Sequence, residues 1–194
     1  MLHHCGTQVI ETERLCLRPF CDTDEADMLA HWVSDPLVQH MYAEPVYSTH
    51  EEVQGLLNRY IASYQKSDTY RWAVILRETG ICIGQIAFFF VDSNNHFGEI
   101  EYCIGRAFQK QGLATEATKA VLAFGFEQIG FHKIQICHRA TNPASRRVIE
   151  KCGFVYEGAL RDFFYDREQD VYIDRLYYSL LKTEWEALRS TSLR

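Results

Sequence analysis

The chain has 194 residues, of which 47 % are apolar and 24 % charged, and its formal net charge is −6 at pH 7. This size and composition are typical of one globular domain, 1–194, with a core of about residues 12–188. The sequence contains no run of eighteen apolar residues, so no membrane span is predicted. The acidic balance argues against a protein that binds nucleic acid by neutralising phosphates. The segment Met1–Gly6 does not resemble a signal leader, so we expect a cytoplasmic protein with no membrane and no nucleic-acid partner.

The N-terminal region predicts one strand and two helices. Residues Arg14–Pro19 alternate between apolar and polar side chains and stop at a proline, as a first strand would. Asp22–Asp24 supplies caps for a first helix, which Pro36 would end. Ser48 and Glu51 have the spacing of a capping box for a second helix. The apolar stripe of that helix consists of Val53, Leu56, Leu57, Tyr60, Ile61 and Tyr64.

The middle of the chain predicts an antiparallel meander of three strands. Strand-like runs span residues 71–76, 81–90 and 97–104. Residues 78–80 and 92–95, which separate these runs, are of the small and polar types that favour turns. Short turns of this kind join neighbouring antiparallel strands.

The C-terminal half predicts a parallel crossover. A helical pattern runs from Leu113 to Gly130, and residues 133–140 form a strand-like run after it. Because strand, helix and strand follow one another, the two strands are expected to be parallel. We therefore expect an α/β (α+β) fold in which helices flank a mixed antiparallel and parallel sheet. The remaining predicted elements are a short helix from Asn142-Pro143 to Cys152-Gly153, strands near Phe154–Leu160 and Val171–Ser179, and a helical piece around Trp185.

The cysteines and histidines indicate neither a disulfide framework nor a metal site. Seven cysteines are scattered along the chain without a C-x-x-C pair, and eight histidines lack any spacing typical of metal ligands. We therefore expect reduced thiols and no metal.

A tight turn, Gln109–Thr115, connects the strand that ends at Ile104 to the helix from Leu113. Backbone N–H groups at a helix N-terminus lack partners, and together with the helix dipole they suit a pyrophosphate. Gly112 and Ala114 would let phosphates approach the backbone closely. The turn lacks the Gly-Lys-Thr of a Walker A loop and the three glycines of a Rossmann turn. It therefore predicts a phosphate-binding turn of another kind.

Two motifs in this order resemble a known family. Gln109-x-x-Gly112-x-Ala114 resembles motif A of the GCN5-related N-acetyltransferases. Asn142-Pro143-Ala144-Ser145, followed by Glu150-Lys-Cys-Gly153-Phe154, resembles the next motif of that family, at the expected distance. The segments 13–19 and 174–185 resemble the RimJ/RimL branch, which acetylates protein N-termini. The resemblance covers nearly the whole chain.

The resemblance implies a sheet in which the strands 97–104 and 133–140 splay apart, with acetyl-CoA in the gap and no metal. It implies that main-chain groups of Cys103 and Ile104 pair with the pantetheine arm and that Asn142 contacts the same arm. Dimers are common in the family, so the resemblance allows a homodimer. The backbone amides implied for the pyrophosphate are those of Gln109, Lys110, Gln111, Gly112, Leu113, Ala114 and Thr115.

An amine attacks a thioester only as the neutral base. A lysine-like amine with a pKa near 10.4 loses about 4–5 kcal/mol at pH 7 before it reacts, whereas an α-amine near 7.7–8 loses about 1 kcal/mol. Glu99 and Glu101 alternate with apolar neighbours and should share one face of their strand. Burial or mutual repulsion there would raise one pKa. Glu101 is the slightly favoured general base, and two solvated, non-catalytic glutamates remain an equal alternative.

The departing thiolate of CoA needs a proton. Many relatives place a tyrosine seven residues after the motif asparagine, where this chain has Ile149. RimL-like proteins suggest Ser145 as the proton donor in its place. An equally good interpretation is that this serine only forms hydrogen bonds in the first helical turn. A covalent route through Cys103 is disfavoured, because no neighbouring histidine would activate the thiol.

Three functions stay open at this point. The first is acetyl transfer to the α-amine of a protein N-terminus, and the second is acetylation of a small amine such as a polyamine or an aminoglycoside. The third is a sensor that binds acetyl-CoA without turnover. The segments 41–47, 92–96 and 162–170 are expected to shape the acceptor cleft.

Overall fold

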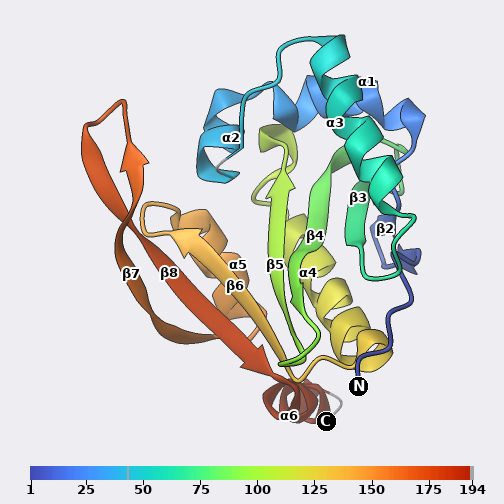
Figure 1. The fold of residues 1–194 in the computed structure, drawn as a ribbon, viewed down its shortest axis with the longest axis vertical. Coiled ribbons are helices and arrows are strands. Elements are labelled where there is room, and N and C mark those ends of the chain that lie inside the picture. The colour runs from blue at the N-terminus through green and yellow to red at the C-terminus, as the bar shows by residue number, and fades with distance from the viewer. Residues whose placement is uncertain (43, 193–194) are drawn as a thin grey trace.

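The described residues, 1–42 and 44–192 of a computed structural model, form one mixed sheet of eight strands. The strands lie in the order β1-β2-β3-β4-β5-β6-β8-β7 (Figure 1). Every neighbouring pair is antiparallel except β5 and β6, which are parallel. The strands are β1 (Ile10–Glu11), β2 (Leu15–Arg18), β3 (Tyr70–Leu76), β4 (Cys82–Asp92), β5 (Phe97–Ile104), β6 (Lys133–Arg139), β7 (Val155–Asp166) and β8 (Val171–Leu181).

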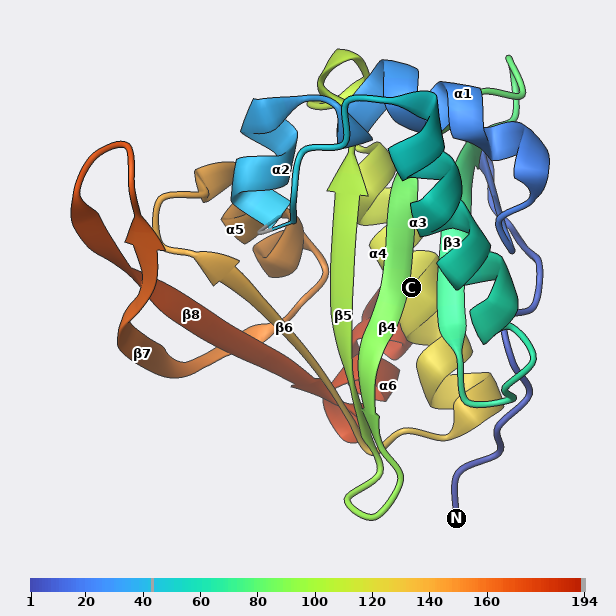
Figure 2. The same ribbon diagram turned by 45° about the horizontal axis from the view of Figure 1, so that its top comes forward.

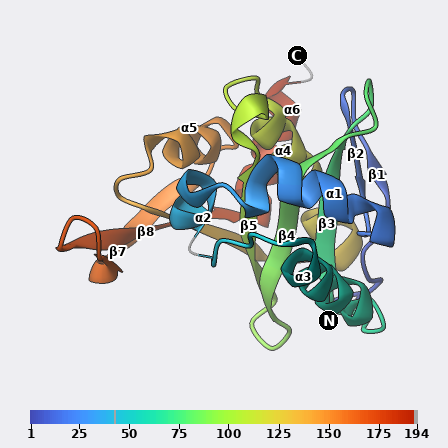
Figure 3. The same cartoon turned by 90° about the horizontal axis from the view of Figure 1, so that it is seen from above.

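Helices cover both faces of this sheet (Figure 3). One face carries α1 to α3, and its core contains Met28, Trp32 and Leu57. The other face carries α4 to α6, whose apolar side chains pack with Ile100 and Ile104 of β5. The helices are α1 (Glu25–Met28), α2 (Pro36–Tyr42), α3 (His50–Ser63), α4 (Leu113–Phe124), α5 (Pro143–Lys151) and α6 (Lys182–Ser192), with single helical turns at η1 (Asp22–Asp24), η2 (Leu29–Val33), η3 (Arg106–Phe108) and η4 (Gly125–Ile129).

The expected α/β class, the β3–β5 meander and the parallel crossover through α4 are confirmed. None of the helices in the described ranges has the length and apolar character that crossing a bilayer requires. The cysteines of the chain are all free thiols.

Three local expectations need correction. Pro36 ends the first helical stretch, but it is also the first residue of α2, because a proline tolerates the first position of a helix. The capping box of α3 joins Thr49 to Glu52, one residue later than the predicted pair. Strand β7 runs to Asp166, so most of the expected loop 162–170 is strand, and only residues 167–170 form a turn.

The two parallel strands diverge near their middle. Their pairing ends at Ile100 and Ile136, although β5 continues to Ile104 and β6 to Arg139. Beyond that point β5 follows β4 and β6 follows β8, so a wedge opens between them (Figure 2). This wedge positions the candidate site.

Candidate functional site

A cavity of about 830 Å³ follows the wedge. Its lining begins at Gly112 and Thr115 at the start of α4 and continues between β5 and β6. It ends among side chains of α2 and β7, including Met41 and Phe164. The cavity thus joins the predicted phosphate turn to an opening on the opposite side of the sheet. Of the sequence-predicted site residues, it is lined by Glu101, Cys103, Ile104, Gln109, Lys110, Gly112, Leu113, Ala114, Thr115, Asn142 and Ser145, and not by Glu99 or Gln111.

The start of α4 presents unpaired backbone donors. Gly112 is its N-cap, with a φ of 82° and no side-chain cap. The first intrahelical hydrogen bond runs from the N–H of Glu116 to the carbonyl of Gly112 at 3.0 Å. The N–H groups of residues 113–115 precede that bond, so they have no partner within the helix. Gln109 stabilises the turn by donating its side-chain amide to the carbonyl of Ile104 at 2.8 Å.

Arg14 holds the same turn against the N-terminal part of the sheet. Its Nε donates to Glu116 Oε2 at 2.7 Å, and its Nη1 donates to the carbonyl of Gln111 at 2.9 Å. Thr12 donates to the other oxygen of Glu116 at 2.7 Å. Burial would raise the pKa of Glu116, but the hydrogen bonds from Thr12 and Arg14 lower it overall. Arg14 of the segment 13–19 therefore has a structural role at the predicted phosphate turn.

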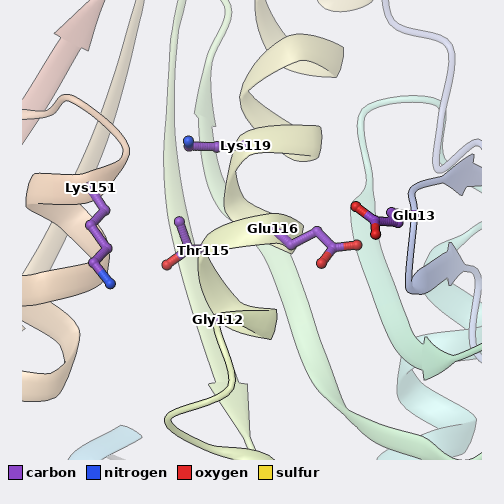
Figure 4. Close-up of a pocket in the computed structure, with 6 residues that line it drawn as sticks. All are labelled: Glu13, Gly112, Thr115, Glu116, Lys119 and Lys151. Atoms are coloured by element: carbon purple, nitrogen blue, oxygen red, sulfur yellow. The ribbon is translucent and has the colours of Figure 1, made fainter.

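A smaller pocket of about 350 Å³ adjoins the turn. Figure 4 shows Lys119 one turn farther along α4 than Thr115 and Lys151 across the gap on α5, while Glu116 and Glu13 lie on the opposite side of α4. Two ammonium groups beside a helix N-terminus make this end of the site attractive to anions.

The two faces of β5 have separate roles. Ile100 and Ile104 belong to the core on the α4 side, and Cys103 belongs to the core on the α1 side. The irregularity in the β4–β5 pairing adds Phe89 to β4, so the alternation along β5 is kept. Glu99 and Glu101 therefore share the face of Cys103, as the alternation predicts.

Each of these glutamates pairs with a different arginine. Arg71 donates from Nη2 to Glu101 Oε1 at 2.8 Å, and its guanidinium lies 4.4 Å from the ring centre of Tyr60. Arg175 donates from Nη2 to Glu99 Oε1 at 3.0 Å. Burial raises the pKa of Glu99, and Arg175 lowers it in part. The carboxylates therefore share a face, but their charges are compensated on opposite sides of β5.

Ser145 contacts a tyrosine that the sequence patterns do not indicate. Its Oγ lies 3.0 Å from the hydroxyl of Tyr102, while its backbone N–H donates to the Oδ1 of Asn142 at 3.0 Å. Burial raises the pKa of Tyr102 above its ordinary value. Ile149 is fully buried in the core on the α4 side. A connected pair of hydroxyls thus lines the cavity, and Ile149 does not.

The thiol of Cys103 is buried, and burial raises its pKa to about 12. A thiol with that pKa is almost entirely protonated at neutral pH and is a weak nucleophile. This observation favours direct attack by the amine over an acetyl-cysteine intermediate.

The end of the cavity near α2 and β7 includes arginines, in its lining or paired with it, that sequence patterns do not indicate. Arg71, Arg139 and Arg175 come from three strands, and their charges carry no local motif. The turn at 92–96 lies at the closed end of the wedge and is absent from the lining. Of the expected segment 41–47, the cavity lining includes Met41, Tyr42 and Glu44, and Ala43 lies outside the described residues.

The sequence has recognisable relatives among characterised and uncharacterised acetyltransferases. The uncharacterized N-acetyltransferase YoaA of Bacillus subtilis is 30 % identical over 174 residues, which cover 90 % of this chain and 97 % of YoaA. The ribosomal-protein-serine acetyltransferase of Escherichia coli is 27 % identical over 142 residues, 72 % of this chain and 76 % of that protein. The spermidine N(1)-acetyltransferase of Vibrio cholerae is 26 % identical over 137 residues, 70 % of this chain and 76 % of that protein.

A solved structure also resembles this chain. The crystal structure of a GNAT-family acetyltransferase from Bacillus anthracis superposes with a TM-score of 0.79 at 28 % identity, covering 91 % of this chain and all of the other. The sequence profile of the acetyltransferase (GNAT) domain matches residues 14–155. The wedge, the uncapped start of α4 and these matches agree, and the chain belongs to the GNAT family of acetyltransferase enzymes.

Proposed function

We propose that this enzyme transfers the acetyl group of acetyl-CoA to the α-amine of a protein N-terminus. The observation that supports this most is the continuous cavity that joins the free backbone amides of α4 to an opening lined by α2 and β7. A donor bound at one end and an amine entering at the other would meet where β5 and β6 diverge.

On the donor side, the backbone amides at the start of α4 would bind the pyrophosphate. Lys119 and Lys151 flank this position and suit the remaining phosphate of CoA. The edge of β5 beyond Ile100 is free of β6, so main-chain groups of Tyr102 there would pair with the pantetheine arm. Those of Cys103 face β4 instead, because the N–H of Gly105 donates to Ile83 and the antiparallel register then pairs Cys103 with Gln85. The carbonyl of Ile104 already accepts the bond from Gln109.

The chemistry requires two proton transfers. The amine nitrogen forms a bond to the thioester carbonyl carbon, the C–S bond breaks, and the amine loses a proton while the thiolate gains one. Glu101 is the proposed acceptor of the amine proton. Ser145 is the proposed donor to the thiolate, and the hydrogen bond with Tyr102 holds its hydroxyl in place.

Two observations favour an α-amine over a polyamine. Both strand glutamates are already paired with arginines, so they offer little uncompensated negative charge to a polycation. An α-amine near pKa 8 is partly neutral at pH 7, so it asks less of a general base than an amine near 10.4. The E. coli relative is named for a ribosomal-protein substrate, and the V. cholerae relative for spermidine.

An acceptor screen tests this proposal. The purified enzyme is given acetyl-CoA with N-terminal peptides, polyamines or aminoglycosides, and CoA release is followed together with the mass of the product. We expect acetylation of peptides at the α-amine. Faster turnover of spermidine than of every peptide would select the polyamine function. Tight binding of acetyl-CoA without turnover of any amine would select the sensor.

A further inference from the structure

Arg139 is a buried cation in the wall of the cavity. It is the last residue of β6 and is 8 % exposed. Its guanidinium carbon lies 4.1 Å from the ring centre of Phe164, so this ring covers one face of the group. A guanidinium stays protonated at neutral pH, so a full positive charge is held at this wall.

Two nitrogen atoms of this guanidinium lack hydrogen-bond partners in the described structure. Within the described part of the chain, the Nε and Nη1 atoms of Arg139 are buried and bond to nothing. Burial lowers the pKa of Arg139, and Asp166 opposes this only in part. One oxygen of Asp166 already accepts from the backbone N–H groups of Glu168 and Gln169, and the other lies 3.5 Å from Nε2 of His40. Buried donors without partners are rare in folded proteins and call for an explanation.

Its neighbours on the same side of the sheet differ in this respect. Arg71 is paired with Glu101, and Arg175 is paired with Glu99. The two glutamates are thus used, and Arg139 has only the charge of Asp166 near it, with no ion pair of its own among the described residues. In a protein with a net charge of −6, a buried cation that is only partly compensated at this wall suits an anionic ligand.

The register of the strands places Arg139 across the wedge from the proposed reaction centre. The last β5–β6 pair is Ile100 with Ile136, so three residues further on Cys103 and Arg139 stand at the same level. Arg139 also shares its face of β6 with Cys137, which contacts Arg175 at 3.0 Å. An amine placed beside Glu101 would therefore bring groups a few bonds away toward Arg139.

We propose that Arg139 binds a carboxylate of the acceptor, so that preferred substrates carry a carboxylate within a few bonds of the reacting amine. This inference rests on the proposed function and adds a substrate class to it. The fork of N–H groups on a guanidinium matches the two oxygens of a carboxylate. Such a carboxylate could belong to an acidic side chain near a protein N-terminus or to a free α-amino acid.

Matched acceptors test the carboxylate and its source. Peptides beginning Ala-Asp and Ala-Asn differ in one charge, and free alanine differs from alaninamide in the same way. We expect kcat/KM to be about 30-fold higher for the carboxylate member of at least one pair, in line with a buried charge-assisted contact. A preference within the peptide pair identifies a side-chain carboxylate, and a preference within the alanine pair identifies a free amino acid.

Arginine variants connect this preference to the site. In Arg139→Gln the ratio between the paired acceptors should fall to near one, and Arg139→Lys should keep part of it. Arg161→Gln removes an exposed arginine of β7 outside the cavity and should keep the full ratio. The thermal midpoint of Arg139→Met should stay level or rise, because the change removes an unpaired buried charge. A fall of several degrees would indicate a purely structural arginine and contradict the inference.

The remaining outcomes separate the two proposals. Acetylation of all peptides without any carboxylate preference would overturn this inference and leave the proposed function in place. If no acceptor reacts, calorimetry of the Ala-Asp peptide with the CoA-bound protein decides: binding that Arg139→Gln abolishes supports the inference while the proposed function fails. Absence of binding overturns both.

Discussion

The proposed donor and acceptor halves of the cavity are built from different parts of the polypeptide. The donor half consists mainly of backbone N–H groups at the start of α4, held by Gly112 and by the contacts of Arg14. The acceptor half consists of side chains, among them Glu101 and Arg139, which come from separate strands. A backbone site depends on chain conformation, and a side-chain site depends on residue identity. Substitutions should therefore affect one half without the other.

The largest effect is expected from a change of backbone preference in the donor half. Gly112→Val places a β-branched residue at a φ of 82° and a side chain at the mouth of the turn. We expect acetyl-CoA to bind about 100-fold more weakly in calorimetry, because charge-assisted bonds to backbone amides are lost. Gly80→Val is the matched control, since Gly80 has a φ of 73° in the β3–β4 turn. Both variants should lose about 1–2 kcal/mol of unfolding free energy, because a side chain is strained at a positive φ. Only Gly80→Val should bind acetyl-CoA normally.

The proton donor should affect turnover and leave donor binding intact. We expect Ser145→Ala to lower kcat by about 100-fold with little change in the KM for acetyl-CoA, as removal of a general acid does. The helix start should survive, because Asn142 bonds to the backbone N–H of Ser145. Tyr102→Phe should lower kcat by about tenfold, and the double variant should be no slower than Ser145→Ala. Additive losses would show that the two hydroxyls act independently.

Replacing the proposed base should give a loss that depends on pH. Glu101→Gln is expected to lower kcat/KM about tenfold at pH 7 and less at pH 9, where more of the amine is already neutral. Glu99→Gln is the natural control, because that carboxylate also pairs with an arginine on the same face. An equal loss at both pH values would show that Glu101 is not the general base. A pH-dependent loss in Glu99→Gln would assign that role to Glu99 instead.

The smallest effect concerns a buried histidine beside the acceptor wall. His138 must donate from Nδ1 to the carbonyl of Arg139, 2.7 Å away, and burial lowers its pKa. The unfolded chain therefore takes up a proton more readily than the folded one, so the free energy of unfolding should fall as pH drops below about 6.5. Urea unfolding at pH 7.5 and 5.5 should show a smaller difference for His138→Gln than for the natural chain. A larger difference in the variant would contradict this assignment.

Most of the fold can be predicted because its signals are local. The meander and the crossover follow from apolar periodicity and turn residues within short stretches, and the structure matches them. Helix α2 has no separate signal, because Pro36 both ends one helical stretch and begins the next. Strand β7 is longer than its pattern predicts, because its outer residues are exposed and its pairing shifts between Leu160 and Phe164, which breaks the alternation.

The candidate site divides in the same way. The phosphate turn is contiguous, so its residue types and their spacing indicate its role directly. The acceptor side depends on pairs that are distant in sequence: Arg71 meets Glu101 across 30 residues, and Arg175 meets Glu99 across 76. Periodicity places the two glutamates on one face but cannot identify their partners. Only the folded arrangement distinguishes the paired arginines from Arg139.

The contacts of Arg14 should couple ligand occupancy at the turn to strand β2, which lies outside the cavity. This residue directly precedes β2 and touches both the carbonyl of Gln111 and the carboxylate of Glu116. A ligand that orders the turn therefore also stabilises the segment around β2, because coupling between two sites is reciprocal. Amide hydrogen exchange in Leu15–Arg18 should slow when acetyl-CoA binds. Strand β2, which is absent from the cavity lining, then acts as a remote reporter of donor binding.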